Sequence, residues 1–533
     1  MRTLLLSNIN MQPLVAFLKP WDVVCGEFNS MLLDLSNPAS AAASPEFGRI
    51  LCLYDTDTLL GDAFYGEGAP VQCELFLDEL ELFAKAHPDK VIVATTFCVG
   101  ARRCLNFADP LSPHSLLAIE ARLNDRLIGI ARANLNILLF DIGSLIRRFG
   151  EDVLLTDSFW YAGRIRYTNF MFRALAERLH QAADAYAGKS RKVLILDLDN
   201  TLWGGIVGEA GPNGIALSEE GVGRCYRDFQ RAVKALQRTG VLLAIASKNN
   251  PADLDEVFRT STMMVLRRED FACIEVNWNP KPQNILNIAE ALNLGIDSFV
   301  FIDDSRVERE MVRAALPDVA IPDFPASVES LPAWLLYDVA PAWFGRYNIT
   351  AEDLAKTSQY KKIEERQKLS RSLDLDAFLE NLQIECVIHV DPVSQINRIA
   401  QMTEKTNQFN LTTRRYQIPQ IQRFLDSPDH AILLLEYKDR FGSEGAVGLA
   451  IIDFFESRID TFLISCRVIG RRIENLILGK VCDLFRERGR NRIIGEFIPT
   501  RKNQQVAHFF DVHGFSLLST DADGRKLYER IIA

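Results

Sequence analysis

The chain has 533 residues, too many for a single hydrophobic core, and its length predicts three or four domains. Hydrophobic residues make up 48% of it and charged residues 24%, the ordinary balance of a soluble globular protein. The net charge of −10 argues against a nucleic-acid partner. Without a long apolar run or a signal-peptide pattern we expect a cytoplasmic protein that does not bind a membrane. The ten cysteines lack the paired spacing of a zinc site or disulfide framework and are expected to be reduced thiols.

Residues 1–188 alternate short apolar runs with helical patterns, which predicts an α/β domain with strands near 4–6, 91–95 and 136–140. This segment is similar to SGNH hydrolases, in which a nucleophilic serine follows the first strand, as Ser7 does here. That family also needs an Asp-x-x-His motif, and Trp160 stands where the histidine would be. We predict an SGNH-like scaffold or docking domain, with a residual hydrolase as the alternative. An amphipathic helix, 170–186, is expected to connect it to the next domain.

The clearest strand signal in the chain is the apolar run that begins at Val193 and ends in Asp197 and Asp199. In open α/β sheets the ligand crevice lies at the carboxyl ends of the strands, so both carboxylates would face a substrate. Two carboxylates so close together repel each other. We therefore expect either a divalent cation beside them or a proton on one of them.

Three later stretches complete a pattern that extends over residues 189–330. A second buried strand ends in Ser247 and Asn249, Lys281 precedes an apolar helical pattern, and a third strand closes on Asp303 and Asp304. This order resembles the four motifs of the haloacid dehalogenase (HAD) phosphohydrolase superfamily. The spacing leaves little room for a cap domain, so the site would be open, and its substrate would be macromolecular or covered by another domain of the chain.

The HAD resemblance implies a role for each of these residues. Asp197 would be the nucleophile that forms an aspartyl phosphate, and Asp199 the general acid and base. Ser247 and Lys281 would hold the phosphoryl oxygens, with Thr201 and Asn249 as further substrate-binding residues. The implied cofactor is Mg²⁺, bound by Asp197, Asp199 through its backbone carbonyl, Asp303 and Asp304.

Residues 331–395 are expected to form a helical connector. Prolines and tryptophans in 326–344 indicate a packed segment rather than a flexible linker, and the polar pattern of 350–371 and the stretch 373–382 predict two helices.

Residues 396–533 predict an α+β domain with strands at 431–437, 446–454 and 458–465, followed by an amphipathic helix to 485. An Arg-x-x-Gly sequence between the last of these strands and the helix exposes backbone amides at a helix N-terminus, which favours an anion. It resembles the pyrophosphate cradle of the GNAT acyltransferase fold. Arg472 replaces the usual second glycine, so a phosphopantetheine arm fits better than coenzyme A. The predicted phosphopantetheine-binding residues are Asn407, Asn410, Arg467, Gly470, Arg472 and Asn503.

Cys466 is a candidate nucleophile in this part of the chain. It follows a predicted strand, is next to Arg467 and precedes a helix N-terminus, three features that stabilise a thiolate. A thiolate there could attack an acyl phosphate and hold the acyl group as a thioester. The alternative is a buried cysteine that only fills the core.

Five long motifs together resemble one family. They are DLDNTLWGGIVGE from Asp197, FIDD from Phe301, KTNQFNLTTRR from Lys405, DRFG from Asp439 and SCRVIGR from Ser465. They are similar to the FkbH-like family, HAD subfamily IIIC, whose members are glyceryl transferase/phosphatases of polyketide biosynthesis. The resemblance implies conversion of 1,3-bisphosphoglycerate into glyceryl-S-acyl carrier protein with loss of both phosphates. We expect Cys466 to capture the acyl group and Asp197 to remove the C3 phosphate, in an order that the sequence leaves open.

Two other classes of function stay open. One is a Mg²⁺-dependent phosphatase acting on another phosphorylated small molecule or carrier-bound acyl group, with the C-terminal domain only a binding module. The other is a GNAT-like acyltransferase that uses coenzyme A thioesters, against which the intact acidic pairs and Arg472 both argue.

Overall fold

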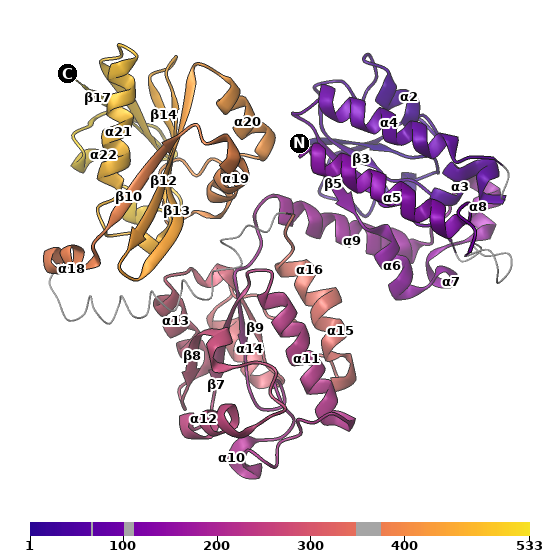
Figure 1. The fold of residues 1–533 in the computed structure, drawn as a ribbon, viewed down its shortest axis with the longest axis horizontal. Coiled ribbons are helices and arrows are strands. Elements are labelled where there is room, and N and C mark those ends of the chain that lie inside the picture. The colour runs from indigo at the N-terminus through magenta and orange to yellow at the C-terminus, as the bar shows by residue number, and fades with distance from the viewer. Residues whose placement is uncertain (66–67, 101–110, 348–374, 533) are drawn as a thin grey trace. The chain divides into compact units, whose positions relative to one another are not determined.

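The computed structural model describes residues 1–65, 68–100, 111–347 and 375–532, and it divides into two compact units (Figure 1). The first unit comprises Met1–His180 with Ile418–Gln420, and the second comprises Gln181–Gln417 and Ile421–Ala533. The predicted helix 350–371 lies outside the described residues. Within the described ranges, no helix has both the length and the apolarity needed to cross a membrane.

The first unit is built on a five-stranded parallel sheet of order β2-β1-β3-β4-β5. The strands are β1 (Arg2–Leu6), β2 (Val23–Cys25), β3 (Phe47–Cys52), β4 (Val91–Thr95) and β5 (Ile137–Phe140). The described helices around it are α1 (Gln12–Val15), α2 (Met31–Ser36), α3 (Thr56–Leu60), α4 (Val71–Ala86), α5 (Leu116–Ala133), α6 (Ile142–Phe149), α7 (Glu151–Leu154), α8 (Asp157–Gly163) and the start of α9 (Asn169–Tyr186). The α/β prediction for this segment is confirmed, whereas its SGNH assignment stays a prediction. Ser7 does follow β1, and its hydroxyl accepts a hydrogen bond from the Ile9 amide, 3.2 Å.

The second unit begins with a four-stranded parallel sheet of order β8-β7-β6-β9. Its strands are β6 (Val193–Leu196), β7 (Leu242–Ser247), β8 (Phe271–Val276) and β9 (Phe299–Ile302). The helices that follow these strands are α10 (Val207–Ala210), α11 (Gly221–Gln237), α12 (Pro251–Thr260), α13 (Lys281–Leu292) and α14 (Arg306–Ala315). Three of the strands, β6, β7 and β9, are those expected from the apolar runs.

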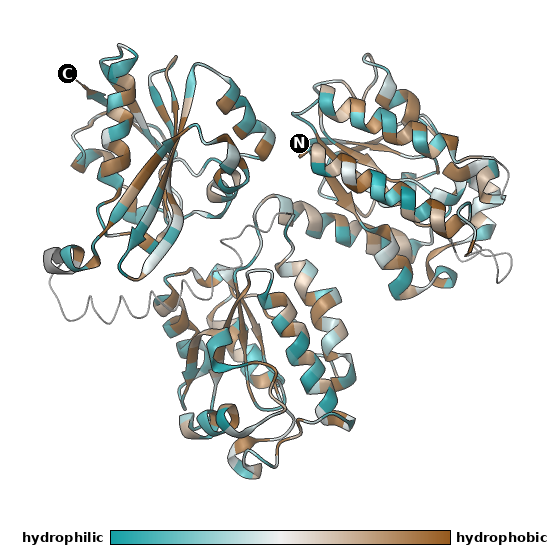
Figure 2. Ribbon diagram, viewed as in Figure 1, coloured by the Kyte–Doolittle hydropathy of each residue, from teal (hydrophilic) through white to brown (hydrophobic). Residues whose placement is uncertain are grey.

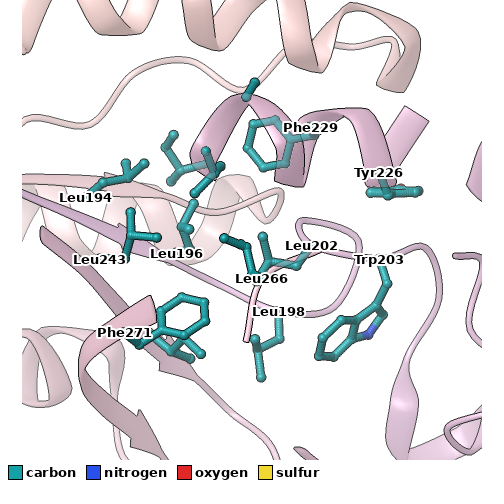
Figure 3. Packing of buried hydrophobic residues seen from close by; sticks show 14 of the residues in the cluster. Leu194, Leu196, Leu198, Leu202, Trp203, Tyr226, Phe229, Leu243, Leu266 and Phe271 are labelled. Atoms are coloured by element: carbon teal, nitrogen blue, oxygen red, sulfur yellow. The ribbon is translucent and has the colours of Figure 1, made fainter. Parts of the chain in front are cut away.

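Both faces of this sheet are buried, which explains why its strands read as continuous apolar runs rather than alternating ones. Along β6, Leu194 and Leu196 join one core cluster, whereas Val193 and Ile195 join another on the opposite face. Figure 3 shows part of the first cluster, to which Leu194, Leu196 and Phe229 of α11 all belong. In Figure 2 the strands are mostly hydrophobic, whereas helices such as α4 and α5 carry hydrophilic residues on one side.

The segment after α14 packs onto this sheet domain. It forms α15 (Leu331–Trp334), a π-helical turn (Leu335–Val339) and α16 (Ala340–Trp343), and Leu331, Leu335 and Val339 are fully buried in the first core cluster. The packed segment expected near 326–344 is therefore confirmed, but it belongs to the core of the four-stranded sheet rather than to a separate connector.

The rest of the second unit forms an eight-stranded mixed sheet. Its strands are β10 (Glu385–Val390), β11 (Phe409–Asn410), β12 (His430–Asp439), β13 (Gly442–Asp453), β14 (Arg458–Ile464), β15 (Arg492–Phe497), β16 (Ser516–Thr520) and β17 (Lys526–Ile531). The helices are α18 (Leu375–Leu382), α19 (Ile396–Lys405), α20 (Ile418–Asp426), α21 (Glu474–Glu487) and α22 (Phe509–Val512).

This sheet starts earlier than the sequence suggested. β10 pairs with β12 in antiparallel register, so residues 385–390, which we assigned to the connector 331–395, belong to the C-terminal sheet. Its side chains are only partly buried because it is an edge strand, and its short alternating pattern gives a weak signal.

The parallel strands β14 and β15 meet only at their starts, where Arg458 is opposite Ile494. Further along β14 the neighbour is β11, which pairs Phe409 with Ile464 and Asn410 with Leu463. The Ile498 amide after β15 donates to the Leu411 carbonyl, 2.8 Å. The chain's own segment 409–411 thus fills the opening between the two strands and pairs the backbone groups that would otherwise be open to a ligand.

Candidate active site

The carboxyl edge of the four-stranded sheet, where its strands end, gathers the predicted phosphatase residues. Asp197 directly follows β6, Ser247 is the last residue of β7, and Asp303 directly follows β9. Lys281 is the first residue of α13, which starts shortly after β8. Because β6 lies between β7 and β9, these residues meet at one edge.

Asp197, Asp303 and Asp304 form a compact acidic triad. Each offers a carboxylate oxygen, and the three oxygens lie within 4.8 Å of one another. Burial, and next the repulsion of Asp197, raises the pKa of Asp303 to about 6, and the same two causes raise the pKa of Asp304. Three carboxylate oxygens that repel one another are a donor set suited to a hard divalent cation. The residues present therefore fit the metal that the sequence predicted.

Lys281 supplies the positive charge of the site. Its side chain is 2% exposed, and its Nζ forms ion pairs with Asp197 and, at 3.2 Å, with Asp303. Nζ also donates a hydrogen bond to the Ala246 carbonyl, 2.6 Å. Burial disfavours a charged lysine, but the two carboxylates outweigh it and raise its pKa. Lys281, the residue predicted to bind the phosphoryl oxygens, is thus paired directly with Asp197.

The side chain of Asp199 does not join the acidic triad. Its Oδ1 accepts hydrogen bonds from Trp203 Nε1, 2.9 Å, and from the Val207 amide, 3.1 Å. Its Oδ2 accepts from Asn249 Nδ2, 2.9 Å. The carboxylate is therefore oriented by three donors, as a general acid and base requires, and only its backbone carbonyl is left for the expected contact to a metal.

The other predicted residues lie beside this network. Ser247 is 1% exposed, and its hydroxyl accepts from Asn249 Nδ2, 3.2 Å. Asn249 thus links Ser247 to Asp199, a positioning role that the sequence did not predict. Thr201 is fully buried, and its hydroxyl has no hydrogen-bond partner among the described residues.

Sequence reasoning missed the residues that orient the site. Trp203 is fully buried and fixes Asp199. Arg309 donates to the carbonyls of Asp303 and Asp304, both at 2.7 Å. The Ser305 amide donates to Asp303, 2.9 Å, and the Ser305 hydroxyl caps α14 by accepting from the Glu308 amide, 3.4 Å. The sequence Ser-x-x-Glu was an available signal for this cap.

No separate cap domain is inserted between the motifs of the site from Asp197 to Lys281, as expected from their spacing. The elements between Asp197 and Ser247 are α10 and α11 with their connecting loops, and those between Ser247 and Lys281 are α12 and β8 with theirs. Three large apolar side chains within a few positions of site residues are exposed: Ile206 by 43%, Trp278 by 74% and Val307 by 70%.

Cys466 lines a separate cavity of about 330 Å³, here called the cysteine cavity. Six of the described residues that line it are basic and one, Asp297, is acidic; the basic ones are Lys192, Arg398, Lys405, Arg467, Arg501 and Lys502. Two of them are already paired, Lys502 with Asp297 and Arg467 with Glu444 at 3.3 Å, and the remaining excess of cations in a chain of net charge −10 favours an anionic ligand. Cys466 lies just after the end of β14, as predicted, and it is partly buried; the next α-helix, α21, begins only at Glu474.

The predicted phosphopantetheine-binding residues separate into two groups. Asn407 and Arg467 line the cysteine cavity. Asn410 and Asn503 are fully buried and do not: Asn503 Nδ2 donates to the carbonyls of Asn410 and Ile498, both at 2.9 Å, and Asn410 Oδ1 accepts from the Thr413 amide, 2.8 Å. These two amides hold 409–411 in place, so the structure gives them a structural rather than a ligand-binding role.

Gly470 and Arg472 lie between Cys466 and α21 and are not among the residues that line the cavity. Both have positive φ, +83° for Gly470 and +58° for Arg472. The left-handed backbone at Arg472 explains why glycine would suit that position.

This backbone leads to a stability prediction. We expect Arg472→Gly to be about 1 kcal/mol more stable than Arg472→Ala, since both lose the guanidinium and only alanine keeps the Cβ that disfavours positive φ. Urea denaturation of the two variants measures the difference. An Ala variant as stable as the Gly variant would contradict the assigned conformation.

Neither a protein-family model nor a curated protein matches this chain. Among solved structures it is similar to the N-terminal part of the protein BF1531 from Bacteroides fragilis, which contains a phosphatase domain and is complexed with Mg. The two are 27% identical, the match covers 65% of this chain and 94% of that chain, and the TM-score is 0.60. Together with the acidic triad and Lys281, this similarity defines an HAD-like phosphatase domain.

Shorter matches are to Ard1 from Thermoplasma volcanium and the GNAT domain of S. lividans PAT, each 17% identical. They cover 28% and 27% of this chain and 98% and 89% of those chains, with TM-scores of 0.21 and 0.22. The C-terminal part is a mixed α/β sheet by its own topology, and the GNAT-like assignment stays a prediction.

Proposed function

We propose that this protein is a Mg²⁺-dependent phosphatase and acyltransferase that converts 1,3-bisphosphoglycerate to glyceryl-S-acyl carrier protein. The observation that carries the phosphatase part is the acidic triad, two of whose members pair with Lys281. It is found in a chain 27% identical to the N-terminal part of BF1531, which contains a phosphatase domain and is complexed with Mg. The observation that supports the acyltransferase part is the thiol in a cavity lined by six cationic side chains.

At the triad, Asp197 attacks the phosphorus atom, and the ester oxygen leaves with a proton from Asp199. Water then attacks the aspartyl phosphate while Asp199 takes its proton. Lys281 neutralises charge on Asp197 and the phosphoryl oxygens, and Asn249 and Trp203 hold Asp199 in place. Mg²⁺, held by Asp197, Asp303, Asp304 and the Asp199 carbonyl, would neutralise the phosphoryl group as a Lewis acid.

At the cysteine cavity, the Cys466 thiolate attacks the acyl carbon of the acyl phosphate. The carbon–sulfur bond forms, and inorganic phosphate leaves with the electron pair of the carbon–oxygen bond. The thiolate of a phosphopantetheine arm then takes the acyl group and releases Cys466. The cationic lining suits a substrate with two phosphates, and an acyl phosphate is activated enough to need mainly orientation.

The second candidate is a plain phosphatase with the C-terminal domain as a binding module. One observation favours it: residues 409–411 fill the opening beside β14, and Asn410 and Asn503, predicted to bind phosphopantetheine, hold them there.

Intact-protein mass spectrometry with Mg²⁺, 1,3-bisphosphoglycerate and a phosphopantetheinylated acyl carrier protein separates the two candidates. We expect an acyl adduct on the wild-type enzyme and then on the carrier, and neither with Cys466→Ala. Cys225→Ala, in α11, is the matched cysteine control and should behave as wild type. Phosphate release without any adduct would instead establish the plain phosphatase.

A further inference from the structure

The DRFG motif forms the tip of the hairpin between β12 and β13. Asp439 is the last residue of β12 and pairs with Gly442, the first residue of β13. The side chain of Asp439 is fully buried, and a carboxylate in such a position is costly unless a cation and hydrogen-bond donors accompany it. Neither the acidic triad nor the lining of the cysteine cavity includes a residue of this motif, so the two sites leave its role open.

Arg471, the last residue of the SCRVIGR motif, is a cation that accompanies Asp439. Its Nη1 lies 3.4 Å from Asp439 Oδ2, and its side chain is 8% exposed. The Arg471 guanidinium lies over the Tyr437 ring, 4.8 Å from its centroid, and the Tyr437 hydroxyl donates to the same carboxylate oxygen, 3.0 Å. Two motifs from separate parts of the sequence therefore meet in one buried ion pair.

This ion pair is tied to the turn that carries the candidate nucleophile. Arg471 Nη2 donates to the carbonyl of Arg467, the residue after Cys466, at 2.9 Å. A second buried carboxylate of the same hairpin, Glu444 in β13, pairs with Arg467 Nη1 at 3.3 Å. The turn itself is a 3₁₀ segment of three residues, Cys466–Val468, and α21 begins only several residues later. The cysteine is therefore not part of a long helix, and side chains of the hairpin hold the turn that carries it.

Stability alone does not explain these buried charges. Replacing a buried ion pair by apolar side chains of similar volume is often neutral or stabilising, so the geometry that the pair fixes is the better explanation. Direct binding of a ligand in the cysteine cavity does not explain Asp439 and Arg471 either, because neither residue lines it. Transfer of an acyl group to a thiol depends strongly on orientation, and a displacement of about 1 Å can lower the rate about 100-fold.

We propose that Asp439 and Arg471 are positioning residues for acyl transfer, and that their ion pair fixes the turn from which Cys466 attacks the acyl carbon. This inference rests on the proposed function and adds a role for the DRFG motif. The Asp439 carboxylate orients the Arg471 guanidinium, and the guanidinium holds the Arg467 carbonyl. The Cys466 thiol is thereby held in place at the wall of the cavity.

The test uses Arg471→Lys in the full-length chain. Lysine keeps a cation for Asp439, but it lacks the planar fork that reaches both Asp439 and the Arg467 carbonyl. Acylation of Cys466 by 1,3-bisphosphoglycerate with Mg²⁺ is followed in a single turnover by intact-protein mass spectrometry, over a range of substrate concentrations. We expect the maximum rate to fall about tenfold or more, with the half-saturating concentration within about twofold of wild type because the cavity lining is unchanged. Arg486→Lys, in a surface pair with Asp483, is the matched control and should behave as wild type.

A second variant separates positioning from folding. Asp439→Asn/Arg471→Met removes both charges, so neither is left buried alone; it should remain folded in thermal unfolding and yet acylate Cys466 as slowly as Arg471→Lys. A folded variant that acylates at the wild-type rate, or a loss confined to the half-saturating concentration, would overturn the positioning role and leave the proposed function intact. A wild-type enzyme that forms no acyl adduct would overturn the proposed function and this inference with it.

Discussion

Asp197→Asn is expected to lower the rate of phosphate release from a phosphoester by about 10⁴-fold or more, because it removes the nucleophile and keeps the shape of the side chain. The amide oxygen of the introduced asparagine could still accept a hydrogen bond from Lys281, so the fold should persist. The rate is measured as inorganic phosphate released with Mg²⁺ in excess, and thermal unfolding confirms that the variant is folded.

Trapping of the covalent phosphoenzyme tests directly whether Asp197 is the nucleophile. Acid quenching of wild-type enzyme during turnover of a phosphate-labelled ester should leave label on the protein, and the Asp197→Asn variant should carry none. Asp323→Asn should match wild type in both measurements, since its side chain is 95% exposed. Label on the Asp197→Asn variant, or a rate within tenfold of wild type, would show that the nucleophile is another residue.

The phosphatase residues could be predicted because their positions follow from local rules. Each aspartate pair ends an apolar run, and in a parallel sheet such run ends meet at one edge, as β6 and β9 show. Strands buried on both faces of a sheet are also easy to recognise in the sequence, because every residue along them is apolar and the run is unbroken.

What the sequence could not supply are pairings between distant residues. An amide-rich stretch was interpreted as a ligand site, but the partner of Asn503 turned out to be the Asn410 carbonyl, 93 positions away. The edge strand β16 has only exposed side chains, so no hydrophobic pattern marked it. In the same way, the Cys466 carbonyl accepts a hydrogen bond from Asn293, 173 positions away, which no local pattern indicated.

Lys281→Met should destabilise the metal-free protein by about 3–5 kcal/mol, because it leaves Asp197 and Asp303 buried together without their cation. The Ala246 carbonyl loses its donor at the same time. Denaturant unfolding in a chelator measures the loss. Lys248→Met is the matched control: its lysine pairs with Glu308 at 2.6 Å but is 33% exposed, so the cost should be about 1 kcal/mol or less.

The destabilisation caused by Lys281→Met should be larger at high pH and smaller when Mg²⁺ is present. The pKa of Asp303 is about 6 even with Lys281 present, so this carboxyl favours the folded state when protonated, and that contribution disappears as the pH rises through 6. Without Lys281 the repulsion from Asp197 is stronger, so the deficit should be larger at pH 8 than at pH 5. Mg²⁺ should stabilise Lys281→Met more than wild type at pH 8, because a cation in the triad then replaces the missing charge. A deficit that is the same at both pH values would mean that Lys281 stabilises the fold through its packing and its bond to Ala246 rather than by balancing the two carboxylates.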